Sequence, residues 1–84
     1  MKAMQVTVLL FASLAEKVGC RRLEVPLEGD DTVGSIRDRL VAAYPALEGF
    51  VPSMMYALDE EYVRPQEAVR PGATLALIPP VSGG

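Results

Sequence analysis

The residues with the clearest chemical potential are the last six, Pro79-Pro80-Val81-Ser82-Gly83-Gly84. Prolines cannot donate ladder hydrogen bonds, so a preceding strand must end at them, and their fixed φ favours an extended direction. The two glycines carry no Cβ and can enter a channel that is too narrow for side chains. A partner enzyme could activate the Gly84 carboxylate as an acyl-adenylate and convert it to a thiocarboxylate, which is a sulfur nucleophile. The alternative interpretation is a frayed terminus without a function.

The rest of the chain offers little chemistry of its own. It has no histidine, so the commonest general base and metal ligand are absent. Cys20 is the single cysteine, which leaves neither a Cys–His dyad nor a zinc site nor an internal disulfide. The acidic run Asp59-Glu60-Glu61 is typical of a solvated turn, with a metal site or an acid–base pair as the alternative. We therefore predict a non-catalytic chain with no metal and no permanently bound cofactor.

Length and charge restrict the possible classes of protein. The 84 residues, half of them hydrophobic, suffice for one small domain. Eight basic and eleven acidic residues give a net charge of -3, which disfavours nucleic acid as a partner. No apolar stretch approaches the roughly 20 residues that span a bilayer, and Gln5 and Thr7 interrupt the first apolar run as in a strand rather than a signal peptide. With a single cysteine, a reducing cytoplasmic location without membrane partners is expected.

Alternating hydrophobicity predicts the strands. Residues 4–11 place Met4, Val6, Val8 and Leu10 on one face and Gln5, Thr7, Leu9 and Phe11 on the other. Residues 21–28 alternate with Leu23, Val25 and Leu27 inward, and Pro26 indicates an edge strand or a bulge. The segment 54–63 predicts a hairpin of two short strands. Residues 73–80 predict a last strand with Leu75 and Leu77 on one side and Ala76 and Ile78 on the other.

Two helices are expected between these strands. Ser13 and Glu16 match a capping box that begins a short helix through Val18, and Gly19 can end it in the left-handed conformation. The main helix lies within residues 29–45, capped by Asp31 or Thr32 and stopped by Pro45. Its apolar side carries Val33, Ile36, Leu40 and Tyr44, and Arg37, Asp38 and Arg39 are expected in solvent.

This order of elements predicts a two-layer α+β domain with a mixed sheet of about five strands on one main helix. The first and last strands are the most apolar and are placed side by side in the centre. They must be parallel because the long connection between them contains the helix. This is the β-grasp, or ubiquitin-like, arrangement. We expect a single β-grasp domain over residues 1–80 and a flexible tail over residues 81–84.

The segment "LALIPPVSGG" resembles the C-terminal signature of the small, sulfur-carrying subunit of molybdopterin synthase. "LLFASLAEKVG" is similar to that family's first strand and helix start, and "ALDEEYV" to its third-strand segment, so the resemblance covers essentially the whole chain. The sequence departs from the family at residues 72–74, where members often have Gly-Asp-Glu, and at Asp59, where they often have Asn. Neither departure touches the tail.

The resemblance implies a sequence of partners. A ubiquitin-activator-like enzyme would adenylate Gly84 with ATP, and a sulfur donor would convert the adenylate to a thiocarboxylate. The large synthase subunit would accept the tail and pass the sulfur to cyclic pyranopterin monophosphate, building the dithiolene of molybdopterin. Gly83 would be the slim neighbour of the reacting residue, and Val81 and Ser82 would line the tunnel. A heterotetramer of two small and two large subunits is also implied.

A tail alone would bind weakly, so the body of the domain is expected to contact the partner. Phe11 and Ile78 could share an apolar patch on the face away from the helix, with Tyr62 nearby and Pro79 and Pro80 leading into the tail. The family's large-subunit contact involves apolar residues at corresponding places. The alternative is that these are core residues covered by loops. Met54 and Met55 are interpreted as core filler.

Two other functions remain compatible with the residues. The activated carboxylate could serve thiamine or tRNA thiolation, or attach the chain to lysines as a ubiquitin-like modifier. Alternatively, the chain is a plain β-grasp interaction module whose tail is inert.

Overall fold

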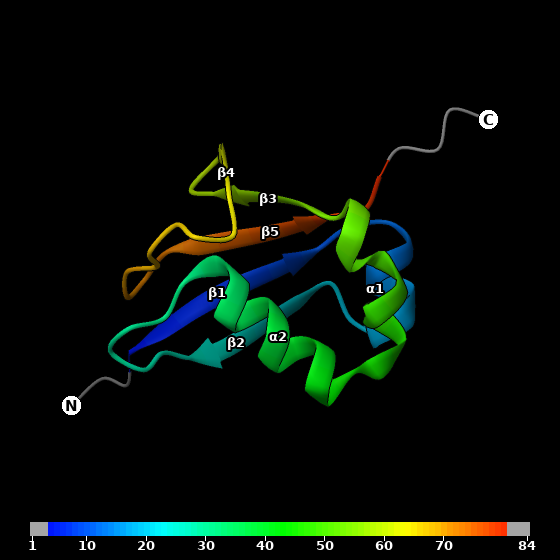
Figure 1. Ribbon diagram of the computed structural model, residues 1–84. Coiled ribbons are helices and arrows are strands. Elements are labelled where there is room, and N and C mark those ends of the chain that lie inside the picture. Colours follow the sequence, from blue (N-terminus) through cyan, green and yellow to red (C-terminus); the bar gives the residue numbers. More distant parts are fainter. Residues whose placement is uncertain (1–3, 81–84) are drawn as a thin grey trace.

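The computed structural model describes residues 4–80 and contains a five-stranded mixed sheet, with the main helix and the 3₁₀ helix that follows it on one face and the short first helix at the end of the sheet (Figure 1). The strand order in the sheet is β2-β1-β5-β3-β4. The predicted α+β, β-grasp fold is confirmed. The elements in chain order are β1 Gln5–Leu10, α1 Ser13–Val18, β2 Arg22–Pro26, α2 Val33–Ala43, the 3₁₀ helix η1 Pro45–Ser53, β3 Met55–Leu58, β4 Glu61–Val63 and β5 Thr74–Ile78.

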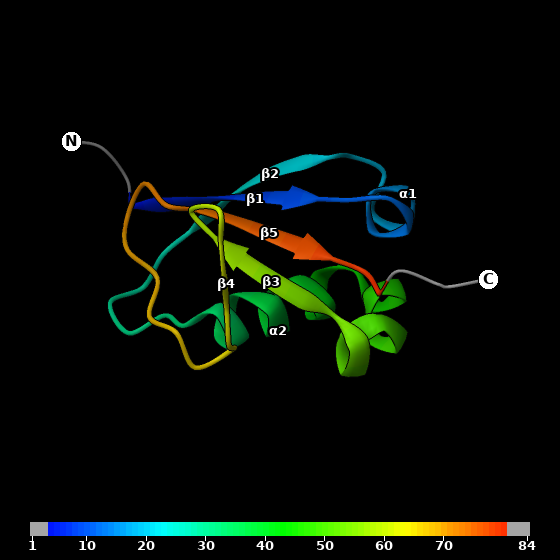
Figure 2. The same cartoon turned by 90° about the horizontal axis from the view of Figure 1, so that it is seen from above.

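The centre of the sheet is the parallel pair of β1 and β5, as expected from their apolar sequences (Figure 2). Val8 lies opposite Leu75 and Leu10 opposite Leu77 in this pair. β2 pairs antiparallel with β1, and β3 pairs antiparallel with β5. Pro26 lies on β2 at the edge of the sheet, where the missing N–H costs no ladder hydrogen bond.

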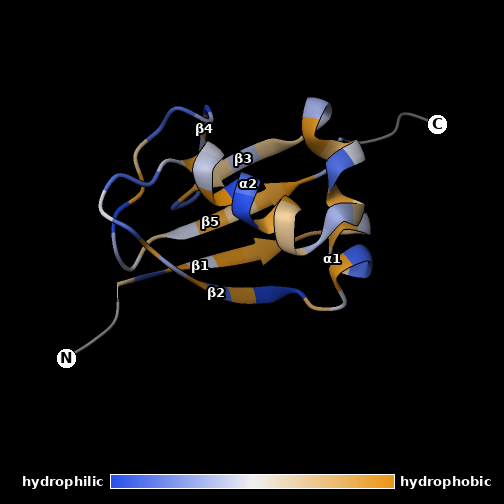
Figure 3. Ribbon diagram, turned by 60° about the horizontal axis from the view of Figure 1, so that its bottom comes forward, coloured by the Kyte–Doolittle hydropathy of each residue, from blue (hydrophilic) through white to orange (hydrophobic). Residues whose placement is uncertain are grey.

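The core lies between the sheet and α2, and the hydropathy colouring places the most apolar strands, β1 and β5, beside the helix layer (Figure 3). Alternation along each strand sends every second side chain into this core. Eight side chains are the largest of the fully buried ones: Leu14, Ile36, Leu47, Leu75, Leu77, Val6, Val8 and Val33. The opposite, outer face of the sheet carries the other set of alternating residues.

The start of α2 is fixed by a polar network at the end of the loop that follows β2. Thr32 is the N-cap, and a reciprocal capping box joins it to Ser35. The buried carboxylate of Asp31 accepts hydrogen bonds from the Glu28 amide (2.7 Å), the Ser35 hydroxyl (2.8 Å) and Arg39 Nη2 (2.7 Å). Burial by itself raises the pKa of Asp31, but these three donors outweigh it and hold the pKa below its ordinary value.

Two predictions about charged residues on α2 are therefore wrong. Arg39 is not a free solvated side chain, because its guanidinium pairs with Asp31 and also donates to the Pro26 carbonyl at 3.1 Å. Arg37 keeps only 19% of its side chain exposed and donates to the Tyr56 hydroxyl at 3.0 Å. Long basic side chains can lie along apolar surface while the charged head finds a partner, which a helical wheel does not reveal.

The predicted capping box at α1 is also wrong. Ser13 is the first residue of the helix, and the N-cap is Ala12, whose side chain provides no cap. Ala12 has φ 52° in a turn in which the Leu14 amide donates to the Phe11 carbonyl. The end of the helix is as predicted, since Gly19 takes a left-handed conformation with φ 93°.

Candidate functional site

The site is centred on the carboxyl end of β5, where the chain leaves the sheet. β5 lies between β1 and β3, and its last residue, Ile78, is paired with Met55. Pro79 is buried and Pro80 is exposed. The tail therefore starts from a strand that is held on both sides and from a proline that is packed against the domain. The predicted tail residues Val81, Ser82, Gly83 and Gly84 lie outside the described residues.

The outer face of the sheet beside this exit is hollowed into an apolar depression of about 490 Å³. The cross-strand register explains its floor, because Leu9 lies opposite Ala76, and Ala76 lies opposite Ala57. The two alanines leave space that larger residues border. Phe11 and Ile78 both line this depression, as the strand phase predicted, and Phe11 is 47% exposed. We name this hollow, with Leu9, Phe11, Ala57, Ala76 and Ile78 in its lining, the outer depression.

One end of the outer depression is acidic. Asp59 and Glu60 line it and form the two-residue turn between β3 and β4, both with positive φ. Asp59 is tied to β5, because its side chain accepts from the Thr74 amide at 3.0 Å and its amide donates to the Thr74 carbonyl at 2.8 Å. These bonds fix the acidic turn beside the apolar floor. Both carboxylates are exposed, as expected for a solvated turn.

Tyr62 was predicted beside the patch of Phe11 and Ile78. It lies on β4, at the opposite edge of the sheet from β2, and is 70% exposed. It does not line the outer depression itself, but its cross-strand partner Ala57 does. Met55, predicted as core filler, is 47% exposed, whereas Met54 is buried as expected. The run Met54-Met55-Tyr56 is apolar throughout, so its alternation phase could not be read from the sequence.

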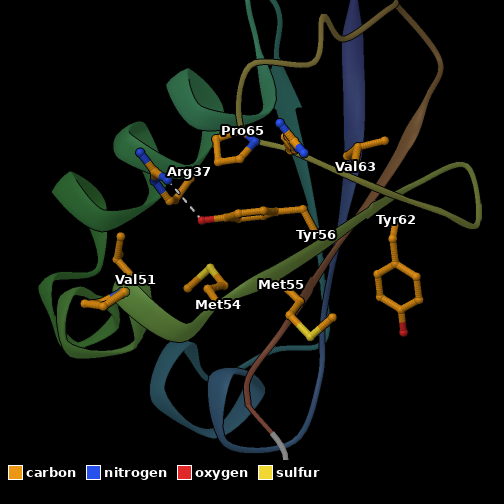
Figure 4. A pocket seen from close by; sticks show the side chains of 10 residues that line it. Arg37, Val51, Met54, Met55, Tyr56, Tyr62, Val63 and Pro65 are labelled. Carbon is orange, nitrogen blue, oxygen red and sulfur yellow. Dashed lines mark hydrogen bonds between the residues drawn. The ribbon is translucent and has the colours of Figure 1, made fainter.

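A second hollow, of about 310 Å³, lies at the sheet edge and was not anticipated (Figure 4). The ring of buried Tyr56 lies across it between Met54 and Pro65, with the Arg37 hydrogen bond at its hydroxyl end. This bond raises the pKa of Arg37, so its guanidinium stays protonated. Met55, Tyr62, Val51 and Arg64 also line the hollow.

Across residues 4–80, no group of three or more His, Cys, Asp or Glu side chains could hold a metal ion. No helix in the same part of the chain is long and apolar enough to cross a membrane. What the described residues offer is an exposed apolar surface beside the end of a strand that is paired on both sides.

Comparison with known proteins identifies the family. The model of the ThiS family matches residues 8–84, a range that includes both the outer depression and the last residue. The chain belongs to the ThiS family. In sequence, this ThiS-family chain is similar to the molybdopterin synthase sulfur carrier subunit of Chlamydomonas reinhardtii, with 39% identity over 96% of this chain and 100% of the relative. It is also similar to small archaeal modifier protein 1 of Haloferax volcanii, with 43% identity over 89% of this chain and 95% of the relative.

Solved structures of similar proteins share the fold. The crystal structure of SAMP1 from Haloferax volcanii superposes with a TM-score of 0.85 at 41% identity, covering 95% of this chain and 99% of that one. A chain in the complex of subunits 1 and 2 of molybdopterin-converting factor from Helicobacter pylori matches with a TM-score of 0.66 at 20% identity, covering 96% and 100%. At that identity the second likeness shows the fold alone.

Proposed function

We propose that this ThiS-family chain is the sulfur-carrying small subunit of a molybdopterin synthase. The observation that carries the proposal is the Gly-Gly end that follows a central, doubly paired strand through a buried and then an exposed proline. Four residues beyond Pro80 span up to roughly 14 Å when extended. The Chlamydomonas relative, named as such a subunit, is aligned over its full length.

The carboxylate of Gly84 is the reacting group in this proposal. It attacks the α-phosphate of ATP in an adenylating partner, which releases pyrophosphate and leaves an acyl-adenylate. A donor that delivers sulfur at the level of hydrosulfide then displaces AMP, and the product is a thiocarboxylate. In the large subunit the sulfur passes to cyclic pyranopterin monophosphate, and water returns Gly84 to a carboxylate. The chain supplies the positioning, and its partners supply the catalytic groups.

The outer depression is the proposed body contact with the large subunit. Phe11 offers a half-exposed aromatic ring at its border, and aromatic side chains dominate the energy of many interfaces. Ile78 lies in the same depression and is the last strand residue before the prolines. A partner that covers Ile78 therefore also fixes where the tail begins. Val81 and Ser82 would line the tunnel, and the full assembly would be a heterotetramer.

The decisive experiment measures the intact mass of the protein isolated from its native cells under gentle, reducing conditions. A species with one oxygen replaced by sulfur, mapped to Gly84, is expected. Deletion of Gly84 should abolish it, and Gly49→Ala, which adds a Cβ where there is space, should not. Adding the large subunit with the pterin precursor should discharge the sulfur. An unmodified mass even after incubation with ATP, activating enzyme and sulfur donor would sink the proposal.

A ubiquitin-like modifier is the second candidate, because the Haloferax relative, at 43% identity, is named a small archaeal modifier protein. In that case the acyl-adenylate would be attacked by lysine amines of other proteins, with an isopeptide bond formed and AMP released. Adducts on many proteins that disappear on deletion of Gly84 would favour it. A carrier that delivers sulfur to thiamine or tRNA would form the same thiocarboxylate and differ only in the acceptor of the sulfur. The large synthase subunit with the pterin precursor would then fail to discharge it.

A further inference from the structure

The hollow at the sheet edge differs in character from the outer depression. Its apolar walls come from η1 and β3 on one side and from β4 on the other, with the Tyr56 ring across the middle (Figure 4). Two arginines line it, Arg37 and Arg64, whereas the chain as a whole carries a net charge of -3. We name it the edge notch. In the edge notch, positive charge lies beside the exposed apolar side chains of Met55 and Tyr62.

The edge notch exists because β4 is shorter than β3. β4 pairs with Tyr56, Ala57 and Leu58, so Met55 has no partner on that side. After Val63 the chain turns down to α2, where the Pro65 carbonyl accepts from the Gly34 amide at 2.8 Å. The uncovered edge at Met55 is thus bounded by fixed walls rather than by a loose loop.

The two arginines have different roles in the edge notch. Arg37 is already engaged, by the Tyr56 hydroxyl and by Asp38 at 3.0 Å, and its side chain is largely covered. Arg64 is exposed, and the salt bridges found within residues 4–80 do not include it. Arg64 therefore offers a binding partner a positive charge that none of these salt bridges engages. An anionic group on a partner would complement it.

The edge notch is continuous with the root of the tail. Met55 lines it and is paired with Ile78, which lines the outer depression and precedes Pro79. Met55 and Tyr62 are two of the four large hydrophobic side chains that stay exposed in the described residues. A protein that receives the tail and covers Ile78 is thus brought to the rim of the edge notch.

The geometry points to a second contact with the large synthase subunit: the edge notch takes an extended segment of that subunit, which packs an apolar side chain against Met55 and Tyr62 and places a carboxylate at Arg64. A volume of about 310 Å³ suits the side chains of one short segment. This inference rests on the proposed function, since it assumes the partner that receives the tail. It adds a charge-specific clamp on the sheet edge to the apolar contact on the outer face.

Charge reversal tests the clamp. Isothermal titration calorimetry would measure the binding of the full-length chain to the large synthase subunit from the same cells. We expect Arg64→Glu to weaken binding at least about tenfold at low salt, because like charges then face each other. The matched control is Arg70→Glu, the same change at an exposed arginine outside the edge notch, which should stay within about twofold of wild type. Tyr62→Ala should weaken binding with little effect on its salt dependence.

The outcomes separate this inference from the proposed function. Thermal unfolding and thiocarboxylate formation are recorded for every variant. If Arg64→Glu is folded, forms the thiocarboxylate and binds the large subunit as tightly as Arg70→Glu, the clamp is wrong and the carrier function stands. If wild type forms no thiocarboxylate and does not bind the large subunit, both proposals fall. Weaker binding by Arg64→Glu alone, with a flatter salt dependence than wild type, supports the clamp.

Discussion

Replacement of Asp31 by Asn should destabilise the fold, because it removes the buried carboxylate that joins three donors at the start of α2. The Asp31 side chain is 8% exposed and receives three donors, from the Glu28 amide, the Ser35 hydroxyl and the Arg39 guanidinium. An Asn side chain of the same shape has one acceptor oxygen and one NH₂ group. At least one native donor would then face another donor, and Arg39 would lose its carboxylate.

The size of the loss follows from the contacts. A hydrogen bond to a charged group contributes about 1.5–3 kcal/mol, and an unsatisfied buried group costs about 1–3 kcal/mol. Arg39 keeps 34% of its side chain exposed, so water screens part of the ion pair. We therefore expect Asp31→Asn to lower the free energy of unfolding by about 2–4 kcal/mol. Domains of this size are stable by about 4–13 kcal/mol, so the loss is a large fraction of the total and the Tm should fall clearly.

The same carboxylate makes stability depend on pH. The pKa of folded Asp31 lies below its ordinary value of 3.8, so the unfolded chain takes up the proton first as the pH falls. The stabilisation by Asp31 is complete well above pH 3.8 and is lost as the pH falls through 3.8 toward the lower folded-state pKa. Asn has no such proton to gain. The difference in unfolding free energy between wild type and Asp31→Asn should therefore shrink below pH 3.8.

Urea unfolding followed by circular dichroism at pH 7 and at about pH 3 measures both effects. The control is Asp30→Asn, which makes the same chemical change at the exposed neighbouring residue and should change the free energy of unfolding by less than about 0.5 kcal/mol. Equal stability of Asp31→Asn and Asp30→Asn at pH 7 would refute the network's contribution. A gap that stays constant down to pH 3 would refute its assignment to the ionised carboxylate.

Three further changes address the site and its support. Phe11→Ala should weaken large-subunit binding about 30-fold in calorimetry while leaving urea unfolding within about 0.5 kcal/mol of wild type, because the ring is half exposed; equal affinity would remove Phe11 from the interface. Asp59→Asn combined with Glu60→Gly should raise the free energy of unfolding by about 1 kcal/mol, since both residues have positive φ in a two-residue hairpin turn; a lower value in urea unfolding would contradict this. Gly34→Ala should cost about 1–3 kcal/mol although Ala favours helices, because its Cβ would lie 3.2 Å from the carbonyl oxygen that accepts the Gly34 amide. Gly49→Ala, which has open space, should be harmless in the same assay.

The fold was predictable because its signals are local and mutually consistent. β1 and β5 alternate strictly, one helical repeat lies between them, and Asp59-Glu60 forms a turn. Few sheet topologies are compatible with these three signals. The connection through α2 then forces the central strands to be parallel. Phase alone also placed Phe11 and Ile78 on the same outer face, and they line one depression.

The missed features depend on partners that are distant in sequence. Arg37 bonds to Tyr56, 19 residues away, and Arg39 bonds to Asp31 eight residues earlier, so a helical wheel shows both only as polar. The exposed position of Met55 follows from the register of β3 against β5, which an unbroken apolar run does not reveal. One signal was available in the sequence. The sequence "EYV" before Arg64-Pro65 leaves room for only a short β4. β3 is therefore longer than β4, and its first residue, Met55, has no partner on that side.

The position of β5 explains why a carrier of this kind would end directly after a core strand. A tail that followed an edge strand such as β2 would start from residues paired on one side only, and fraying there would move its tip. β5 is paired on both sides, its last residue is opposite Met55, and the next residue, Pro79, is buried. The outer depression and the edge notch meet at this same Ile78–Met55 pair. A partner that holds both surfaces would therefore also hold the strand end and the buried proline from which the tail starts.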